Sequence, residues 1–362
     1  MQDYPVAEIN LTSLQHNFER VKQLAPNSKI MSVIKADAYG HGAIQVAQAL
    51  HDSDGFAVAR LSEGLRLRAA GIQQPIVILE GVNSIADLQT AADNTLSIVF
   101  HHASQLELIS TVQLNKPLTF CWLMVETGMN RLGLNTDQLE EALNVLNKSP
   151  NIIGETGLMS HFANSDLVGD PRNQQQLDIL MSSAEQYGLE TSMANSAAIM
   201  SIAASHGNWV RPGIMLYGSS PFEDKVAQDL DLKPVMLLKS KLIAMHPLQV
   251  GDRVGYGGNW SAEKLGHVGV VSIGYGDGYS RHLSNVGSVV IHNQRVAILG
   301  RVSMDMITID LSNVDEAKIG DEVILWGTEL VTVDDMAQKA NTISYELLCQ
   351  LNERVIRDYL HG

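Results

Sequence analysis

The stretch from which the architecture of this chain can be read is I30-M-S-V-I-K-A-D-A-Y-G-H-G42. Its mostly apolar start ends at Lys35, and glycines follow at 40 and 42. A short apolar run closed by glycine predicts a buried strand, a turn and then a helix, here over residues 43–50. A lysine at such a strand end either snorkels to water or loses its charge and reacts as an amine with a carbonyl compound. The stretch alone leaves both interpretations open.

Length and composition predict a globular protein with two cores. The chain has 362 residues, 45% of them hydrophobic and 18% charged, which favours one large and one smaller domain. The net charge of -15 argues against a nucleic-acid partner, because such proteins need clustered Lys and Arg. The first ten residues lack the apolar core of a signal peptide, and no apolar run reaches about 18 residues. We therefore expect a cytoplasmic protein with no membrane partner.

The two cysteines, Cys121 and Cys349, are far apart and show no C-x-x-C spacing. Neither a disulfide framework nor a metal site is expected, and both residues are interpreted as structural thiols.

Outward from Lys35, short apolar runs alternate with helical patterns eight times. The runs are 30–34, 56–59, 76–79, 96–99, 118–125, 157–159 with the residues before it, 191–194 and 209–210. The helical patterns include 14–24, 62–70, 85–92, 138–146, 173–187 and 197–205. Eight such repeats predict an α/β barrel of the (β/α)8 type. An open doubly wound sheet is the alternative, although no G-x-G-x-x-G follows the first strand.

From about residue 230 the pattern changes to short strands separated by Gly-Asp turns. V250-G-D-R-V254 and I319-G-D-E-V323 are two such turns. This pattern of short strands and turns predicts a second, mostly β C-terminal domain.

Polar residues gather at the downstream ends of the predicted barrel strands, the face on which barrels hold their active sites. They are Lys35, Arg131, His161, Asn195, Ser196 and Arg211. Each alone is more often a solvated or capping residue, but their shared placement favours a functional site. Gly213 allows backbone amides to approach an anion, and Ser196 offers a hydroxyl. A carbonyl cofactor with a phosphate, pyridoxal 5'-phosphate (PLP), fits this set.

Several long motifs resemble those of bacterial alanine racemases over essentially the whole chain. They are V33-I-K-A-D-A-Y-G-H-G42, E126-T-G-M-N-R-L-G133, M159-S-H-F-A163, A194-N-S-A-A198, V210-R-P-G-I-M-L-Y-G218, V254-G-Y-G-G258, G274-Y-G-D-G-Y-S-R281, G300-R-V-S-M-D305 and I343-S-Y-E346. The resemblance implies a PLP-dependent isomerase that interconverts L-alanine and D-alanine and supplies D-alanine for peptidoglycan. It also implies a barrel over 12–229, a β domain made of 1–11 and 230–362, and a head-to-tail homodimer with shared active sites.

Carried onto the matching positions, the resemblance makes Lys35 the Schiff-base lysine and one of two catalytic bases. Tyr256 matches the second base, which the partner subunit supplies. Inverting a Cα requires proton transfer on two opposite faces, so two differently placed groups are expected. Without the family match, Tyr256 would be interpreted as an aromatic packed in a Gly-rich turn.

The resemblance also assigns the residues around the cofactor and the substrate. His161 and Arg211 match the residues that link the tyrosine to the pyridine nitrogen, and a permanently cationic Arg211 should keep that nitrogen unprotonated. The other cofactor positions are Tyr39, Arg131, Asn195, Ser196, Gly213, Ile214 and Tyr345. Arg131 and Met304 match the residues at the substrate carboxylate. The substrate access positions match Asp166, Tyr275, Arg281, Arg301 and Ile343.

Met124 departs from the family pattern, because many members have a carbamylated lysine there that orients the arginine. A thioether cannot accept a guanidinium hydrogen bond as an anionic carbamate does. We therefore expect Arg131 to bind another anion, a chloride or a neighbouring carboxylate; the alternative is that Met124 fills space and the substrate alone holds Arg131. Branches without this lysine include racemases of broader range, so a racemase for serine or other amino acids stays an alternative. A PLP decarboxylase and a PLP carrier are further alternatives, disfavoured by the pair Lys35 and Tyr256.

Overall fold

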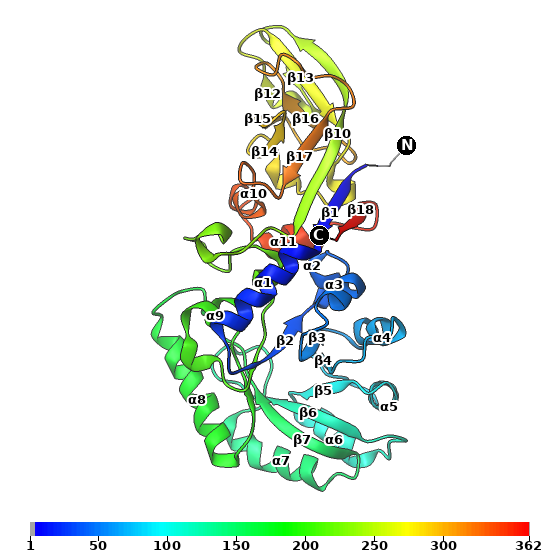
Figure 1. Cartoon of the computed structure of the whole chain (residues 1–362), viewed down its shortest axis with the longest axis vertical. Helices are drawn as coiled ribbons and strands as arrows, with labels where there is room; N and C mark the ends of the chain where they lie inside the picture. The colour runs from blue at the N-terminus through cyan, green and yellow to red at the C-terminus, as the bar shows by residue number, and fades with distance from the viewer. Residues whose placement is uncertain (1–3, 362) are drawn as a thin grey trace.

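Eight parallel strands close into a barrel in the first part of the chain (Figure 1). The computed structural model describes residues 4–361. The first barrel strand pairs on one side with the second, Met31 opposite Gly55. On the other side it pairs with the eighth, Lys29 opposite Trp209, which closes the ring. The predicted (β/α)8 barrel is confirmed, and the open doubly wound sheet is wrong. The barrel strands are β2 (Lys29–Val33), β3 (Gly55–Val58), β4 (Ile76–Ile78), β5 (Ser97–Phe100), β6 (Leu118–Met124), β7 (Ile152–Met159), β8 (Thr191–Ser192) and β9 (Trp209–Val210).

Helices surround the barrel close to the predicted positions. The helix expected over 197–205 is shorter, because Ile202 leaves the helical conformation and packs against the core; a 3-10 turn, Ala203–Ser205, follows. The barrel helices are α1 (Leu11–Leu24), α3 (Ala43–Ala49), α4 (Leu61–Ala69), α5 (Ile85–Asp93), α6 (Ala103–Thr111), α7 (Leu139–Lys148), α8 (Pro171–Tyr187) and α9 (Ser196–Ser201).

Several barrel strands are buried on both faces, which explains their continuous apolar runs. Every residue of β3 and β5 is buried, since one face meets the barrel filling and the other the helices. Trp122 is fully buried beside Gly157, where a Cβ would lie 2.5 Å from the Trp122 ring. Glycine at that position therefore makes room for the largest side chain of the core.

The second domain is built around an eight-stranded sheet with the order β13-β16-β15-β14-β17-β10-β1-β18. Its first-in-sequence strand, β1, pairs antiparallel with β10 and parallel with β18, so the two ends of the chain meet in this sheet. The strands are β1 (Val6–Asn10), β10 (Met236–Leu248), β13 (Gly266–Val271), β14 (Ser288–Ile291), β15 (Gln294–Leu299), β16 (Ile307–Asp310), β17 (Glu322–Trp326) and β18 (Ile356–Leu360), with a separate pair β11 (Arg253–Val254) and β12 (Trp260–Ser261). Helices α10 (Val333–Lys339) and α11 (Ser344–Gln350) complete it. The exact boundaries at 11/12 and 229/230 stay predictions, and residues 1–3 and 362 lie outside the described part.

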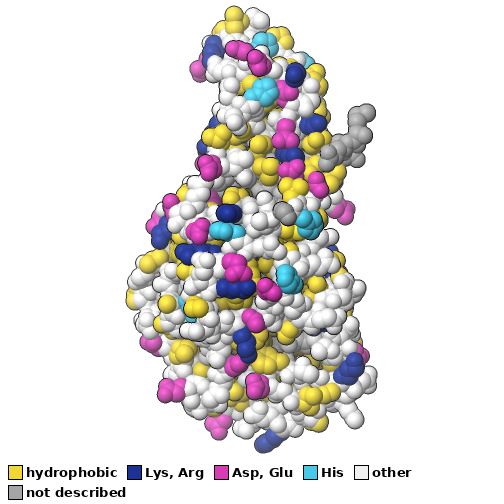
Figure 2. Space-filling model, viewed as in Figure 1, with side chains coloured by type: hydrophobic (Ala, Val, Ile, Leu, Met, Phe, Trp, Pro, Cys, Tyr) yellow, Lys and Arg dark blue, Asp and Glu magenta, His cyan; other side chains and the backbone are white. Residues whose placement is uncertain are grey.

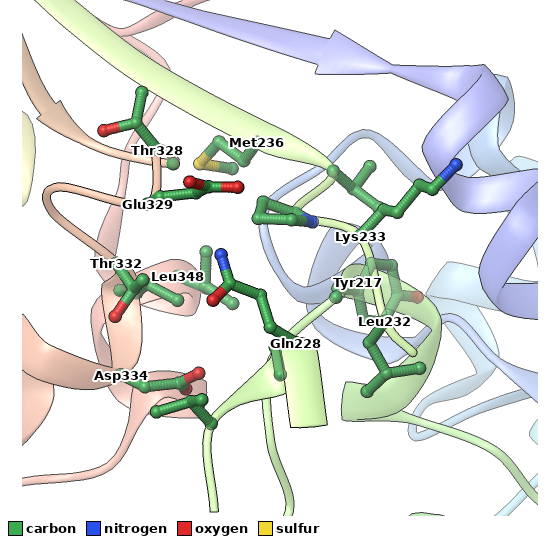
Figure 3. Close-up of a pocket in the computed structure, with 17 residues that line it drawn as sticks. Tyr217, Gln228, Leu232, Lys233, Met236, Thr328, Glu329, Thr332, Asp334 and Leu348 are labelled. Atoms are coloured by element: carbon green, nitrogen blue, oxygen red, sulfur yellow. The ribbon is translucent and has the colours of Figure 1, made fainter. Parts of the chain in front are cut away.

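The two domains lie end to end along the long axis of the molecule (Figure 1). At their junction, buried Asn17 of α1 donates its side-chain amide to the carbonyls of Leu216 (3.0 Å) and Lys233 (2.8 Å). A cavity of about 400 Å³ lies there (Figure 3). Its lining includes Tyr217, Gln228 and Leu232, and the β domain contributes Thr328, Thr332 and Asp334. This cavity contains none of the predicted site residues.

On the face drawn in Figure 2, Lys and Arg side chains are scattered among Asp and Glu over both domains. Within residues 4–361, no helix has the length and apolar character needed to cross a membrane. The same residues contain no cluster of three or more His, Cys, Asp or Glu side chains arranged to hold a metal ion.

Candidate functional site

A cavity of about 540 Å³ opens at the carboxyl ends of the barrel strands, and all the predicted cofactor positions line it. Met124 also lies in its wall, and α11 contributes from the β domain. The structure therefore brings together segments that are more than 300 residues apart in sequence. The predicted residues in the lining are Lys35, Tyr39, Arg131, His161, Asn195, Ser196, Arg211, Gly213, Ile214 and Tyr345.

Lys35 is followed by an unusual turn, α2 (Lys35–Tyr39). Residues Ala36 to Tyr39 have φ between 52° and 54°, and Gly40 has φ of 79°. This is the left-handed region, which residues with a Cβ normally avoid. The turn is closed by hydrogen bonds from Ala38 N–H to the Ile34 carbonyl (2.9 Å) and from Gly40 N–H to the Ala36 carbonyl (3.0 Å). As a result, Lys35 and Tyr39 both line the same cavity.

The environment of Lys35 makes its ammonium easier to deprotonate than that of an exposed lysine. Burial lowers the pKa of Lys35, and the positive charge of Arg131 lowers it further. Glu80 and Glu63 oppose this shift more weakly. Because Lys35 also lines the cavity, its position favours the reactive amine over the snorkelling alternative.

His161 and Arg211 lie next to each other in the cavity, the first neutral and the second charged. Burial and then the charges of Arg211, Arg131 and Lys35 lower the pKa of His161 to about 3, so its imidazole is neutral at pH 7. Burial lowers the pKa of Arg211 to about 9, which still leaves the guanidinium charged at pH 7.

The Arg211 guanidinium is held by the barrel itself. It donates to the Ser192 hydroxyl (2.6 Å) and to the Ser160 carbonyl (2.5 Å), and its Nη2 lies 3.4 Å from His161 Nδ1. A buried cation with these partners cannot turn away from the cavity without leaving them unsatisfied.

At the other end of the cavity, neutral donors converge around Gly213. The Ser196 hydroxyl accepts from the N–H groups of Gly213 (2.9 Å) and Met215 (3.3 Å). A Cβ at Gly213 would lie 2.7 Å from the Tyr39 hydroxyl, so only glycine leaves this space open. Burial raises the pKa of Tyr39 and of Tyr345, so both phenols are protonated donors at neutral pH. This arrangement suits a phosphate.

Asn195 lines the cavity, but its side chain serves the backbone. Its Oδ1 accepts from the N–H of Ala198 (3.1 Å) and from the Ser165 hydroxyl (2.8 Å), which caps α9. Asn195 thereby fixes the start of the helix that carries Ser196.

Arg131 lies beside the buried end of β6, where the Met124 side chain is 8% exposed. No ion pair found within residues 4–361 includes Arg131. The bound chloride and the neighbouring carboxylate both stay predictions.

The remaining predicted residues do not line this cavity. Tyr256, Met304 and Tyr275 are 71%, 53% and 43% exposed on the β domain, so the interpretation of Tyr256 as a packed aromatic is wrong. Arg281 and Arg301 are exposed on the same domain. Asp166 and Ile343 line a neighbouring cavity that shares Asn195 and Tyr345 with the main one.

Sequence patterns did not place two residues in or beside the site. Cys349 lines the cavity, and its spacing of four from Tyr345 on α11 is the signal that indicates it; its interpretation as a structural thiol stays a prediction. Gln176 of α8 donates to the Thr127 hydroxyl (3.1 Å) and to the His161 carbonyl (3.1 Å), and so ties the two loops that follow β6 and β7. Nothing in its local sequence indicates this contact.

Comparison with known proteins gives consistent similarities. The family model described as "Alanine racemase, N-terminal domain" matches residues 9–221, and "Alanine racemase, C-terminal domain" matches residues 235–359. The alanine racemases of Aeromonas hydrophila and Nitrosococcus oceani are 43% and 45% identical to this chain over 355 residues, covering 98% of it and 99% of each relative. The crystal structure of biosynthetic alanine racemase from Pseudomonas aeruginosa superposes with a TM-score of 0.93 at 41% identity, over 99% of this chain and 100% of that one.

Proposed function

The chain belongs to the alanine racemase family and is an isomerase that interconverts L-alanine and D-alanine, and we propose that it uses PLP and one base from each of two copies of the chain. The observation that carries the proposal is the single cavity that holds an amine of lowered pKa, a fixed guanidinium and a set of neutral donors around Gly213. We further propose that the D-alanine serves peptidoglycan synthesis in the cytoplasm.

The residues present fit PLP. The space that a Cβ at Gly213 would fill, with the hydroxyls of Tyr39 and Ser196 beside it, would hold the phosphate, and Lys35 would hold the aldehyde end. Bound PLP supplies an aldehyde for amines and a ring that withdraws electrons from the Cα of an amino acid. Arg211, charged and firmly bonded, would face the ring nitrogen without giving up a proton.

Racemisation needs a proton transferred on each face of the Cα, and a single lysine can serve only one of them. The lowered pKa of Lys35 makes its amine more readily available as a base than that of an ordinary lysine. We infer that Tyr256 of the partner subunit acts on the other face. The support is its position: a 71% exposed tyrosine, with exposed Tyr275 and Met304 on the same domain, is available to a second copy.

Substrate breadth is the second candidate. Met124 cannot bond to the guanidinium of Arg131, and no ion pair of the described residues engages that guanidinium. A carboxylate-binding arginine with few constraints would accept amino acids larger than alanine, serine among them. A chloride beside Arg131 would restrain it instead.

One experiment tests these proposals together. Purified protein with PLP is given L-alanine, L-serine or L-lysine separately, and optical rotation is followed alongside carbon dioxide release. Rotation that decays to zero with alanine, without gas, supports the racemase; decay with serine as well supports the broader range. Gas evolution indicates the decarboxylase, and retained PLP absorbance without turnover indicates the carrier.

A further inference from the structure

The left-handed turn after Lys35 requires support from outside itself. Four consecutive residues with a Cβ, Ala36 to Tyr39, lie at positive φ, and such residues do not hold this conformation by local preference. The side chains at its two ends, Lys35 and Tyr39, both line the cavity. Whatever holds the turn therefore sets the position of both.

Helix α4 contacts this turn at two successive residues. Ala36 donates its backbone N–H to Oε1 of Glu63 (2.7 Å), and Arg66 Nη2 lies 3.4 Å from Oδ1 of Asp37. Oε2 of the same Glu63 accepts from the N–H groups of Ala59 (2.8 Å) and Arg60 (2.9 Å). One carboxylate thus joins the residue after Lys35 to the end of the next barrel strand.

We propose that Glu63 is a positioning residue for the reaction: it holds the left-handed turn and so places Lys35 and Tyr39 relative to each other across the cavity. The role assigned to Lys35 rests on the proposed function. Glu63 does not line the cavity, so apart from the weak effect of its charge on the Lys35 pKa it acts through the backbone of Ala36 and not on the substrate.

A simpler role for Glu63 is to cap α4, because its Oε2 accepts from the N–H of Arg60, the residue that precedes the helix. The two oxygens separate the roles, since Oε2 serves the cap and Oε1 serves the turn. Glutamine has one acceptor oxygen and an NH2 group. In Glu63→Gln that oxygen can satisfy the two cap donors, and the NH2 then faces the Ala36 N–H, which loses its acceptor.

The experiment compares Glu63→Gln with Asp87→Asn in the full-length protein. Asp87 occupies the corresponding early position of α5, where Ser84 caps the helix, so its change disturbs a barrel helix start away from the turn. Amide hydrogen exchange over residues 33–42 and 61–69 reports the turn and the helix. In parallel, borohydride fixation of PLP on Lys35 is quantified by mass spectrometry, and kcat and KM for alanine are measured with PLP added.

We expect Glu63→Gln to speed exchange over 36–40 by roughly tenfold or more, since it removes a hydrogen bond to a charged acceptor. Exchange over 61–69 should stay near that of the parent protein. The yield of PLP fixed on Lys35 should fall, and kcat should fall about tenfold with KM changed much less, because the amine is misplaced while substrate binding is not. Asp87→Asn should change none of these.

Equal behaviour of the two variants over 36–40 would overturn the proposal and leave Glu63 a helix cap. Absence of fixed PLP on Lys35 in the parent protein would instead refute the proposed function, whatever Glu63 does. Should Glu63→Gln not fold, Arg66→Met removes the second contact from a side chain that is 62% exposed. It must then raise exchange over the same turn by a smaller factor, and no rise would refute the support of the turn by α4.

Discussion

The barrel half and the β-domain half of the predicted site differ in how complete they are within one chain. In the barrel, Arg211 is 5% exposed and bonded to Ser192 and Ser160, and Ser196 is 3% exposed and bonded to Gly213. On the β domain, Tyr256 is 71% exposed in a loop with glycines at positive φ. The first half is an enclosed pocket with buried, hydrogen-bonded side chains, whereas the second is an exposed surface.

This difference shows where each half obtains its precision. Buried hydrogen-bonded groups are positioned by the cost of leaving them unsatisfied, so the barrel pocket needs only its own chain. An exposed tyrosine has no such restraint and gains a defined position only against another surface. A site made of both halves is therefore expected to depend on two chains.

The largest effect should come from Lys35→Ala, which removes the amine from the barrel pocket. Activity should fall by about four orders of magnitude or more, because the residue serves both as attachment point and as base. The absorbance of protein-bound PLP should be lost with it. A variant that retains turnover and this absorbance would place the amine elsewhere in the pocket.

Tyr256→Phe should lower turnover by roughly 10²–10⁴-fold, the range expected for loss of one acid/base group, and should keep the PLP absorbance. Exchange of the alanine Cα proton in deuterated water, measured from L- and from D-alanine, should be lost from one enantiomer more than from the other. Undiminished racemisation in both directions would remove Tyr256 from the mechanism.

Mixing the two inactive variants tests directly whether the halves come from different chains. In a dimer of one Lys35→Ala chain and one Tyr256→Phe chain, one site has both changes and the other has neither. Random re-assembly should restore about a quarter of the parent activity, since half of the dimers carry one intact site of two. Two copies of the same variant mixed together serve as the control. No recovery, with mixed dimers shown by native mass spectrometry, would place both groups in one chain.

The barrel and its pocket could be predicted because their causes are local. Strands such as β3 are buried on both faces and give uninterrupted apolar runs, and the pocket residues follow those strands. The left-handed turn at Ala36 to Tyr39 could not be predicted, since no glycine marks those four positions. Its support by Glu63 joins a side chain to a backbone N–H 27 residues away, which leaves no pattern in the sequence.

Arg211→Gln should have an intermediate effect. It removes the fixed charge and leaves the Ser160 carbonyl with a weaker donor. We expect kcat to fall about ten- to a hundredfold, as for loss of one preorganised electrostatic contact. Ser192→Ala, which removes only one hydroxyl acceptor of the same guanidinium, is the matched milder variant and should cost less. Equal losses in the two variants would mean that orientation and not charge is what Arg211 contributes.

The smallest effect is a pH dependence of stability that arises in the barrel domain, from His41 in the segment 30–42. His41 is 0% exposed, and burial lowers its pKa to about 4 from an ordinary 6.5. The unfolded chain therefore takes up a proton below pH 6.5 that the native protein refuses until about pH 4. The contribution of His41 to stability is complete above pH 6.5 and should fall by about 1.4 kcal/mol per pH unit, or about 3 kcal/mol in all, as the pH drops to 4.

His41→Gln should make this part of the pH dependence less steep, because glutamine does not titrate and can still donate to the Ala38 or Tyr39 carbonyl that His41 Nδ1 contacts. His161, whose pKa burial lowers to about 3, keeps a slope of its own in the variant. The free energy of unfolding measured in denaturant at pH 7.5, 6, 5 and 4 gives the comparison. His51→Gln, at a side chain that is 69% exposed, should leave the slope unchanged. A parent protein as stable at pH 4.5 as at pH 7.5, or a His41→Gln variant with the parent slope, would show that acid sensitivity arises outside this stretch.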